Sequence, residues 1–239
     1  MLNKKTLLKI KKLALKIDHD IAFGGKSKGN KHLLRVTKIA QFLAQKIGAD
    51  ANITIAGAFL HDTALPSGND YKYSNNKKIV KELIKYFDLS QDELNKISEC
   101  VASHEGTVKP KILEAKIVHD SDVLDKIGLL GIIRHTWKTT NKNELNPSAI
   151  KKEDVDKIIN HISWRQKQLQ TLIAKKIANY LTTPINQKEA KTIVSFTANL
   201  ANQGVITEKI AVAIHKYINN KQNTKLKEQL NLNYLKLFK

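Results

Sequence analysis

The chain has 239 residues, of which 41% are hydrophobic and 26% are charged, a balance that allows a packed core and excludes global disorder. Lysine and arginine total 41 against 22 aspartate and glutamate, a formal charge of +19, and the one cysteine, Cys100, excludes an intramolecular disulfide framework. No apolar run approaches the ~20 residues that a membrane-spanning helix needs.

The N-terminal segment 1–17 predicts a basic amphipathic helix. Leu7, Ile10, Leu13 and Ile17 fall at helical spacing, and lysines interrupt them. A secretory signal needs an uninterrupted apolar stretch of roughly 7–15 residues, so we expect a cytoplasmic protein.

Helical periodicity continues through the rest of the chain, with no β alternation or hairpin dipeptide between the segments. Gly48 is expected to end a helix, and Ser90 with Glu93, like Asn186 with Glu189, has the spacing of a capping box. The apolar stripes lie in residues 36–47, 55–60, 79–87, 94–101, 113–127, 147–181 with a break near 161–165, 186–203 and 207–218. Pro184 is expected to block the sixth of these helices.

This pattern predicts an all-α fold in two parts. Residues 1–139 are expected to form a metal-binding helical core, and residues 140–239 a C-terminal helical extension packed on it. The polar segment 219–229 reads as a linker, and residues 230–239 as a short docking helix or a frayed end. The C-terminal helices could mediate a homodimer.

The dipeptide His-Asp occurs three times, and its second copy, His61-Asp62, has the most informative context. It follows the apolar stretch 56–60, where burying an imidazole beside a carboxylate is costly unless a third group pairs with them. A divalent metal is one such group, since both side chains are metal ligands. The alternative is a helix end with a solvated aspartate and a capping histidine.

Further candidate ligands lie on other predicted helices. His32 opens one, His104 closes another, and Asp120, Asp122 and Asp125 interrupt an otherwise apolar helix that also carries His119. Helical bundles build metal sites from side chains on facing helices, so this ordered set favours a metal site.

The set resembles the HD superfamily of metal-dependent phosphohydrolases, and more closely a bacterial branch of HD-domain hydrolases. The resemblance is carried by His32, Arg35-Val36, Leu60-His61-Asp62, His104, the block Asp120-x-Asp122-x-Leu124-Asp125-x-x-Gly128 and Gly131-Ile132-x-Arg134. It covers roughly residues 17–134 and continues weakly to about 203.

The resemblance implies that His32, His61, Asp62 and Asp120 hold one divalent ion, which the sequence leaves open among Mn, Mg, Fe, Ni, Co and Zn. It implies hydrolysis of a phosphate ester, with a nucleotide as the favoured substrate, by a water that the ion activates. His104 would bind the substrate phosphate or a second ion.

Other residues would take supporting roles. Asp122 and Asp125 would orient a ligand, or else cap a helix or pair with Lys126 or Arg134. Arg35 would reach a phosphate or brace a carboxylate. Lys26, in the polar loop 24–29, is expected to bind the substrate.

The sequence departs from the family pattern in one place that bears on catalysis. Many superfamily members carry an acidic residue shortly after the His-Asp pair, and here Thr63-Ala64-Leu65-Pro66 follows. A general acid is then expected from Asp20, from His19 or from the water on the metal. The alternative function is a non-catalytic HD-fold protein whose basic surface binds nucleic acid or an acidic partner.

Overall fold

The computed structural model describes residues 2–68, 71–182 and 185–220. Within these residues the chain forms eleven α-helices and two short 3-10 helices, and no strand. The predicted all-α fold class is therefore confirmed. None of the described helices is long and apolar enough to cross a membrane.

Contacts divide the chain into two compact units. The first unit comprises Met1–Asp122 with Leu169–Ala174, and the second comprises Val123–Gln168 with Lys175–Lys239. The division falls near the end of one helix, whereas the predicted boundary at residue 139 lies inside the next.

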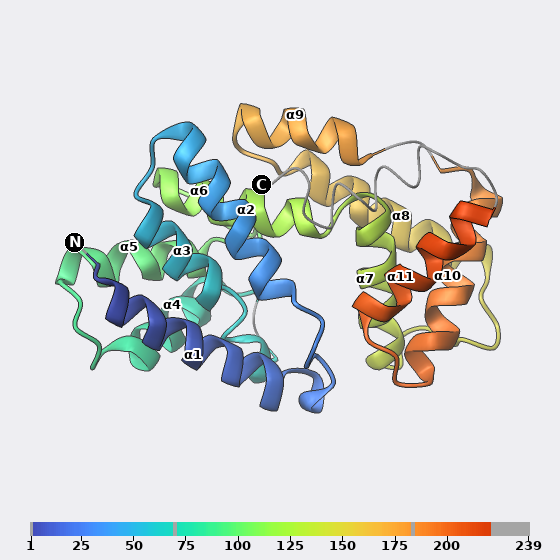
Figure 1. Ribbon diagram of the computed structural model, residues 1–239, viewed down its shortest axis with the longest axis horizontal. Coiled ribbons are helices and arrows are strands. Elements are labelled where there is room, and N and C mark those ends of the chain that lie inside the picture. Colours follow the sequence, from blue (N-terminus) through green and yellow to red (C-terminus); the bar gives the residue numbers. More distant parts are fainter. Residues whose placement is uncertain (1, 69–70, 183–184, 221–239) are drawn as a thin grey trace. The chain divides into compact units, whose positions relative to one another are not determined.

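The first unit is organised around one apolar helix. It contains α1 (Lys4–Asp20), α2 (His32–Ile47), α3 (Ala51–Leu60), α4 (Tyr73–Ile84), α5 (Gln91–Ala102), most of α6 (Leu113–Asp125), and the 3-10 helices η1 (Ala22–Gly25) and η2 (Leu65–Ser67). Helices α1, α2 and α5 all pack on α3, and α4 packs on α5 (Figure 1). Because α3 is covered on several sides, it is apolar almost all round, and its last five residues are buried.

Close packing in this unit depends on Gly57 of α3. A Cβ atom at this position would lie 2.5 Å from the Cβ of Cys100 on α5 and 3.2 Å from Val118 on α6. Glycine thus allows three helices to approach one another just before the chain reaches His61.

The local signals of the sequence position these helices. Gly48 ends α2 with φ +81°, which suits glycine, and Asp50 caps α3 through its side chain. Ser90 and Glu93 form the predicted capping box at the start of α5. These stops and starts bring His32 to the beginning of α2 and His61 to the end of α3.

The second unit contains the C-terminal helices. They are α7 (Gly128–Asn141), α8 (Lys152–Lys167), α9 (Leu172–Leu181, which begins in the first unit), α10 (Gln187–Asn202) and α11 (Thr207–Asn220). Helix α7 contacts α8, α10 and α11 (Figure 1). The predicted capping box of Asn186 and Glu189 is present at the start of α10.

The segment 147–181 is broken into two helices as predicted, but the break lies at 168–171, between α8 and α9. The predicted position near 161–165 is wrong, because α8 runs through it, with Val155, Ile158 and Ile162 continuing one buried stripe. Pro184 and the proposed docking segment 230–239 lie outside the described residues.

Candidate metal centre

Four ligand-type side chains of the first unit converge on one point. His32 is the first residue of α2, His61 and Asp62 directly follow α3, and Asp122 lies in the last turn of α6. His61 and Asp122 are fully buried and His32 is 6% exposed, whereas the Asp62 side chain is 18% exposed. The cluster is therefore closed on the protein side and open to solvent at Asp62.

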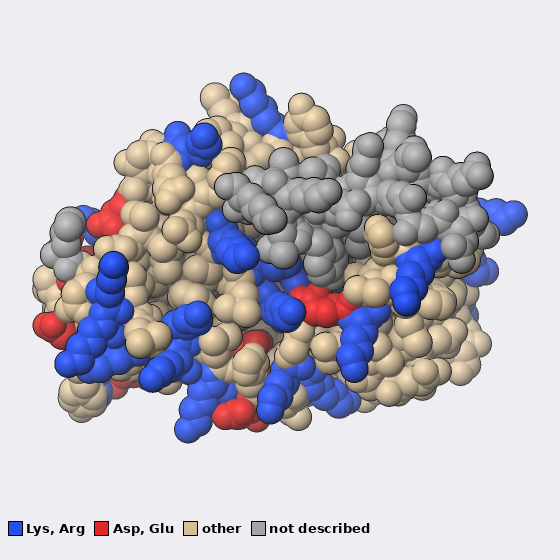
Figure 2. All heavy atoms as spheres, viewed as in Figure 1, with Lys and Arg blue, Asp and Glu red and all other residues tan. Residues whose placement is uncertain are grey.

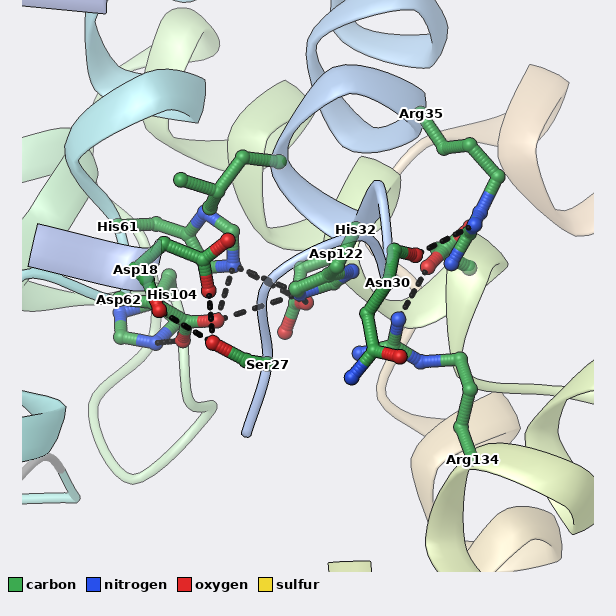
Figure 3. Close-up of polar contacts among 12 residues, drawn as sticks. Asp18, Ser27, Asn30, His32, Arg35, His61, Asp62, His104, Asp122 and Arg134 are labelled. Carbon is green, nitrogen blue, oxygen red and sulfur yellow. Dashed lines mark hydrogen bonds and ion pairs between the residues drawn. The ribbon is translucent and has the colours of Figure 1, made fainter. Parts of the chain in front are cut away.

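Each carboxylate oxygen of this cluster lies at nearly the same distance from the two imidazole nitrogens. The two imidazole Nε2 atoms of His32 and His61 face each other at 3.1 Å. Asp62 Oδ2 lies 3.3 Å from each of these nitrogens, and Asp122 Oδ1 lies 3.2 Å from His32 and 3.3 Å from His61. Figure 3 shows these side chains pointing toward one another.

The donor set needs a positive charge at its centre. His61 Nδ1 lies 2.8 Å from the carbonyl oxygen of Ala58, which can only accept, so Nδ1 carries a proton. In the neutral imidazole, Nε2 then presents a lone pair toward two carboxylates and a second imidazole. Burial lowers the pKa of His61, but Asp62 and Asp122 outweigh burial and raise the pKa to about 10.

A divalent cation fits this arrangement better than a proton. Metal–nitrogen and metal–oxygen bonds are about 2.0–2.2 Å long, so two ligands at a right angle around one ion lie about 3 Å apart. The observed nitrogen–nitrogen and nitrogen–oxygen separations of 3.1–3.3 Å agree with this geometry. Two imidazoles and two carboxylates are also ligands that Mn, Fe, Ni and Zn accept. His32, His61, Asp62 and Asp122 are thus the residues that could hold an ion.

The structure changes one member of the predicted ligand set, because it does not bring Asp120 to this cluster. Asp120 Oδ1 accepts a hydrogen bond from the backbone N–H of Gln170 at 2.7 Å. Its Oδ2 accepts from the backbone N–H and the hydroxyl of Thr171, at 2.8 and 2.6 Å. Asp120 therefore binds the start of α9. In the cluster, Asp122 occupies the position that the resemblance assigned to Asp120.

His104 belongs to a second, adjoining group. Its Nδ1 lies 2.7 Å from the carbonyl oxygen of Val101, which directs Nε2 toward Asp62 Oδ1 at 3.7 Å and Glu105 Oε1 at 3.4 Å. Among the described residues, His104 Nε2 is a buried nitrogen with no hydrogen-bond partner. Asp62 thus directs one carboxylate oxygen toward each group. Glu105 was not among the site residues predicted from the sequence.

The third His-Asp pair supports this second group from behind. His119 is buried on α6, and its Nδ1 donates to the carbonyl oxygen of His104 at 2.7 Å. Gly106 leaves room for this ring, since a Cβ there would lie 3.1 Å from His119 Cε1. His119 therefore fixes the turn that carries His104.

The remaining predicted site residues lie outside the cluster of four. Arg35 Nη1 donates to the carbonyl oxygen of Asn30 at 3.0 Å, so Arg35 braces the loop that leads into His32. In the second unit, Asp125 forms an ion pair with Arg134 at 3.0 Å, one of the two structural alternatives considered for it. Lys26 is exposed at the end of η1. Ligand contacts of these three residues stay predictions.

Asp18 of α1, which lies outside every motif of the sequence, shares a pocket with Asp62 of the cluster. Asp18 and Asp62 line the same small pocket, whose other walls include Ile17 and Leu33. Burial raises the pKa of Asp18, and a hydrogen bond from Ser27 opposes this rise. No motif contains Asp18, so only the fold could show that it faces the site.

Comparisons with known proteins agree with this geometry. Residues 30–127 match the family model described as the HD domain, which confirms the resemblance drawn from the motifs. The fold is similar to a structural-genomics protein from Lactobacillus plantarum, with 23% identity over 85% of this chain and 98% of that chain, and a TM-score of 0.56. No curated protein matches the chain.

Bacillus subtilis YpgQ is similar as well. One of its structures matches with 17% identity over 83% of this chain and 95% of that chain, at a TM-score of 0.55. Its complex with ADP matches with 18% identity over 83% and 96%, at a TM-score of 0.53. At these identities the similarity shows a shared fold.

Proposed function

We propose that the protein is a metal-dependent phosphohydrolase acting on a phosphate ester, because its residues 30–127 match the HD-domain family model. One observation carries the proposal. The Nε2 atoms of His32 and His61 lie 3.1 Å apart, and one oxygen each of Asp62 and Asp122 lies 3.2–3.3 Å from both nitrogens in a largely buried site. Such a set of facing lone pairs is costly without a cation.

The four side chains have distinct tasks in this proposal. His32, His61 and Asp122 hold the ion from the buried side, and Asp62 holds it at the edge that solvent reaches. A bound divalent ion supplies a Lewis acid and lowers the pKa of water on it toward neutrality. Asp62 therefore marks the side from which a phosphate ester approaches.

His104 is proposed to bind the phosphoryl group. Because Nδ1 is used by Val101, Nε2 is the atom that faces the substrate side, and it is buried beside Asp62. An imidazolium there would donate to a phosphoryl oxygen, and Glu105 at 3.4 Å would stabilise its charge. Asp62, His104 and Glu105 could instead hold a second ion. A measured ratio of two metals per chain would indicate this.

A nucleotide is the substrate class to test first. The formal charge of +19 attracts anionic substrates in general, and the similar protein YpgQ has been solved in complex with ADP. Neither observation identifies a base or a sugar. The screen should therefore include nucleoside phosphates and simple phosphate esters side by side.

The test combines metal analysis with hydrolysis assays. Protein purified without chelator should contain about one divalent ion per chain, and it should release inorganic phosphate from at least one ester. His61→Ala should lose both metal and activity while keeping its helical circular dichroism. Asp92→Asn, which changes an exposed carboxylate of α5, is the matched control and should keep both. The proposal would be refuted if the wild-type protein contained no metal and if His61→Ala had the same activity as wild type.

A second candidate function rests on the charge distribution. Figure 2 shows Lys and Arg side chains at many separate points of the face that it draws, with few acidic side chains between them. A non-catalytic protein could use such a surface to bind nucleic acid. Binding that falls steeply with salt would support this function, and the absence of binding at low salt would exclude it.

A further inference from the structure

Helix α1 carries a row of lysines along its outer face. Ile10 and Ala14 are buried on its inner side, and α1 packs on α3. The exposed lysines follow the helical spacing i, i+4, i+7 and i+11, and they are Lys5, Lys9, Lys12 and Lys16. At 3.6 residues per turn, all four fall within about 60° of one another around the helix axis. These four residues are called the lysine row below.

The lysine row lacks the acidic partners that lysines of other helices have. Lys85 of α4, Lys96 of α5 and Lys152 of α8 each pair with a carboxylate one turn away, at 2.6–2.7 Å. Within the part of the chain that the structure describes, no lysine of the row forms an ion pair. The first 17 residues contain no aspartate or glutamate, so the row has no partner on its own helix until Asp18 and Asp20.

This placement of charge costs the helix stability. Consecutive lysines of the row are three or four residues apart, and like charges at that spacing destabilise a helix. The first turn of α1 also contains Lys4 and Lys5 and no acidic residue, which puts cations at the positive end of the helix dipole. A bound polyanion would replace these repulsions with attractions.

The row ends beside the metal centre. Its last member, Lys16, is followed by Ile17 and Asp18, which line a small pocket. The other residues of that pocket are Ala14, Ala22, Leu33, Asp62 and Thr63. Asp62 is the ligand residue whose side chain solvent reaches. A chain molecule held along the row therefore arrives at the open edge of the site.

The loop between α1 and α2 continues the positive surface. Ser27 and Asn30 are buried and fix this loop. The Ser27 Oγ lies 3.0 Å from Asp18 Oδ1, and the carbonyl oxygen of Asn30 accepts from Arg35 at 3.0 Å. The lysines next to these two anchors are exposed, and they are Lys26, Lys28 and Lys31. Figure 2 shows basic side chains over the region where Figure 1 draws α1.

A single-stranded nucleic acid fits this surface better than a membrane or a mononucleotide. Among the apolar residues of α1 only Leu8 is exposed, so the helix has no apolar face to insert into a bilayer. The row extends about 16 Å at 1.5 Å per residue, and the phosphates of one nucleotide would contact only part of it. The ligand side chains other than Asp62 are at most 7% exposed, so the site suits a flexible strand rather than a duplex.

We propose that the lysine row and the loop 22–31 hold the backbone of a single-stranded nucleic acid and direct one of its phosphates to the metal centre, an inference that rests on the proposed function. Helix α1 contains no Phe, Tyr or Trp, so it contacts phosphates and does not stack on bases. At the site, a water oxygen forms a bond to phosphorus, and the bond from phosphorus to the ester oxygen breaks. The leaving oxygen keeps the electron pair of that bond and gains a proton from the water.

The salt dependence of binding tests this surface without turnover. The probe is a labelled oligothymidylate, with chelator present to prevent hydrolysis. The slope of log affinity against log salt is about −0.7 per phosphate contact, so the four contacts of the row alone weaken binding about 50-fold between 50 and 200 mM salt. Lys9→Gln combined with Lys12→Gln removes two contacts and should make this fall about sevenfold smaller.

The matched control removes the same charge from other helices. Lys85→Gln combined with Lys96→Gln changes two lysines that pair with carboxylates, and it should keep the wild-type salt dependence. Both double variants should keep their helical circular dichroism and their metal content. An equal loss of salt dependence in both would show that only the net charge matters, and would overturn the inference.

Turnover with added metal tests whether the strand is a substrate. The variant of Lys9 and Lys12 should raise KM for the oligonucleotide severalfold and leave kcat for p-nitrophenyl phosphate unchanged, because that ester is too short to reach the row. Oligonucleotide binding that is absent, or that is unchanged in this variant, would overturn the inference. The proposed function would still stand in that case if simple esters are hydrolysed.

Two further results would also overturn the inference. The first is tighter binding to vesicles containing phosphatidylserine than to the oligonucleotide, lost in the same variant, which would assign the row to a membrane surface. The second is salt-dependent binding at the row by a metal-loaded protein that hydrolyses no ester. That result would refute the proposed function, and the strand would be a ligand and not a substrate.

Discussion

Two aspartates on one helix allow a matched test of the metal centre. Asp120 and Asp122 lie two residues apart on α6, and the same substitution to asparagine can be made at each. Asp122 Oδ1 faces His32 and His61, whereas both oxygens of Asp120 accept hydrogen bonds at the start of α9. We expect Asp122→Asn to weaken metal binding and Asp120→Asn to weaken folding.

The expected magnitudes differ in kind. Loss of a residue that only supports a metal ligand costs about 10–100-fold in affinity, so removing the charge of Asp122 itself should cost at least that much. Asp120→Asn removes a helix-capping charge and turns one acceptor into a donor that faces a backbone N–H. Burial raises the pKa of Asp120, so its charge also has a desolvation cost that offsets part of the gain. We therefore expect a loss of about 1–2 kcal/mol, within the range of a helix cap.

The assay is thermal melting with and without added metal. A loss of 1–2 kcal/mol corresponds to a fall in Tm of roughly 2–8 °C for a chain of this size. Metal at a hundred times its Kd should stabilise the wild type by about 2.7 kcal/mol. Asp120→Asn should melt lower and keep this metal-induced rise. In Asp122→Asn, a 10–100-fold loss of affinity should leave only about 1.4 to 0.4 kcal/mol of it. The reverse result, with the rise lost in Asp120→Asn and kept in Asp122→Asn, would refute the assignment.

Three further changes test the packing and electrostatics of the fold. Gly57→Ala should lower the free energy of unfolding in urea by about 1–3 kcal/mol, because its Cβ would overlap Cys100. An unchanged urea midpoint would contradict this packing. Ser90→Ala should cost about 1 kcal/mol by removing the cap of α5, and Ser90→Asn should restore it. Burial, with the nearby His161, lowers the pKa of His135 to about 3, whereas an unfolded histidine titrates near 6.5. The stability that neutral His135 contributes is therefore complete above about pH 6.5 and is lost as the pH falls toward 3. His135→Asn should flatten this fall in urea titrations, and an NMR titration showing His135 protonated at pH 6 would contradict it.

Much of the local structure could be predicted from the residues alone, because it depends on neighbours in the chain. Ser90 with Glu93 and Asn186 with Glu189 cap helices through contacts three residues apart. Gly48 ends α2 because glycine adopts a positive φ without a steric cost. Helical periodicity in turn reports which face of each segment is buried, and this is sufficient for the fold class.

The convergence of His32, His61 and Asp62 could also be predicted, though by resemblance rather than by periodicity. Each of these residues lies in a motif with a fixed order in the chain, and the structure brings the three side chains together. The ion itself stays a prediction until metal analysis is done.

Only the tertiary structure could choose between Asp120 and Asp122. An α-helix turns about 100° per residue, so two residues apart means faces that are about 200° apart. Nothing in the sequence says which face of α6 meets the imidazoles, because that depends on how α6 packs on the other helices. The position of Asp18 depends on packing in the same way, since a pocket wall can be supplied from any point in the chain. Residue type and spacing therefore determined the helices and the chemistry, and three-dimensional packing decided which carboxylates meet the site.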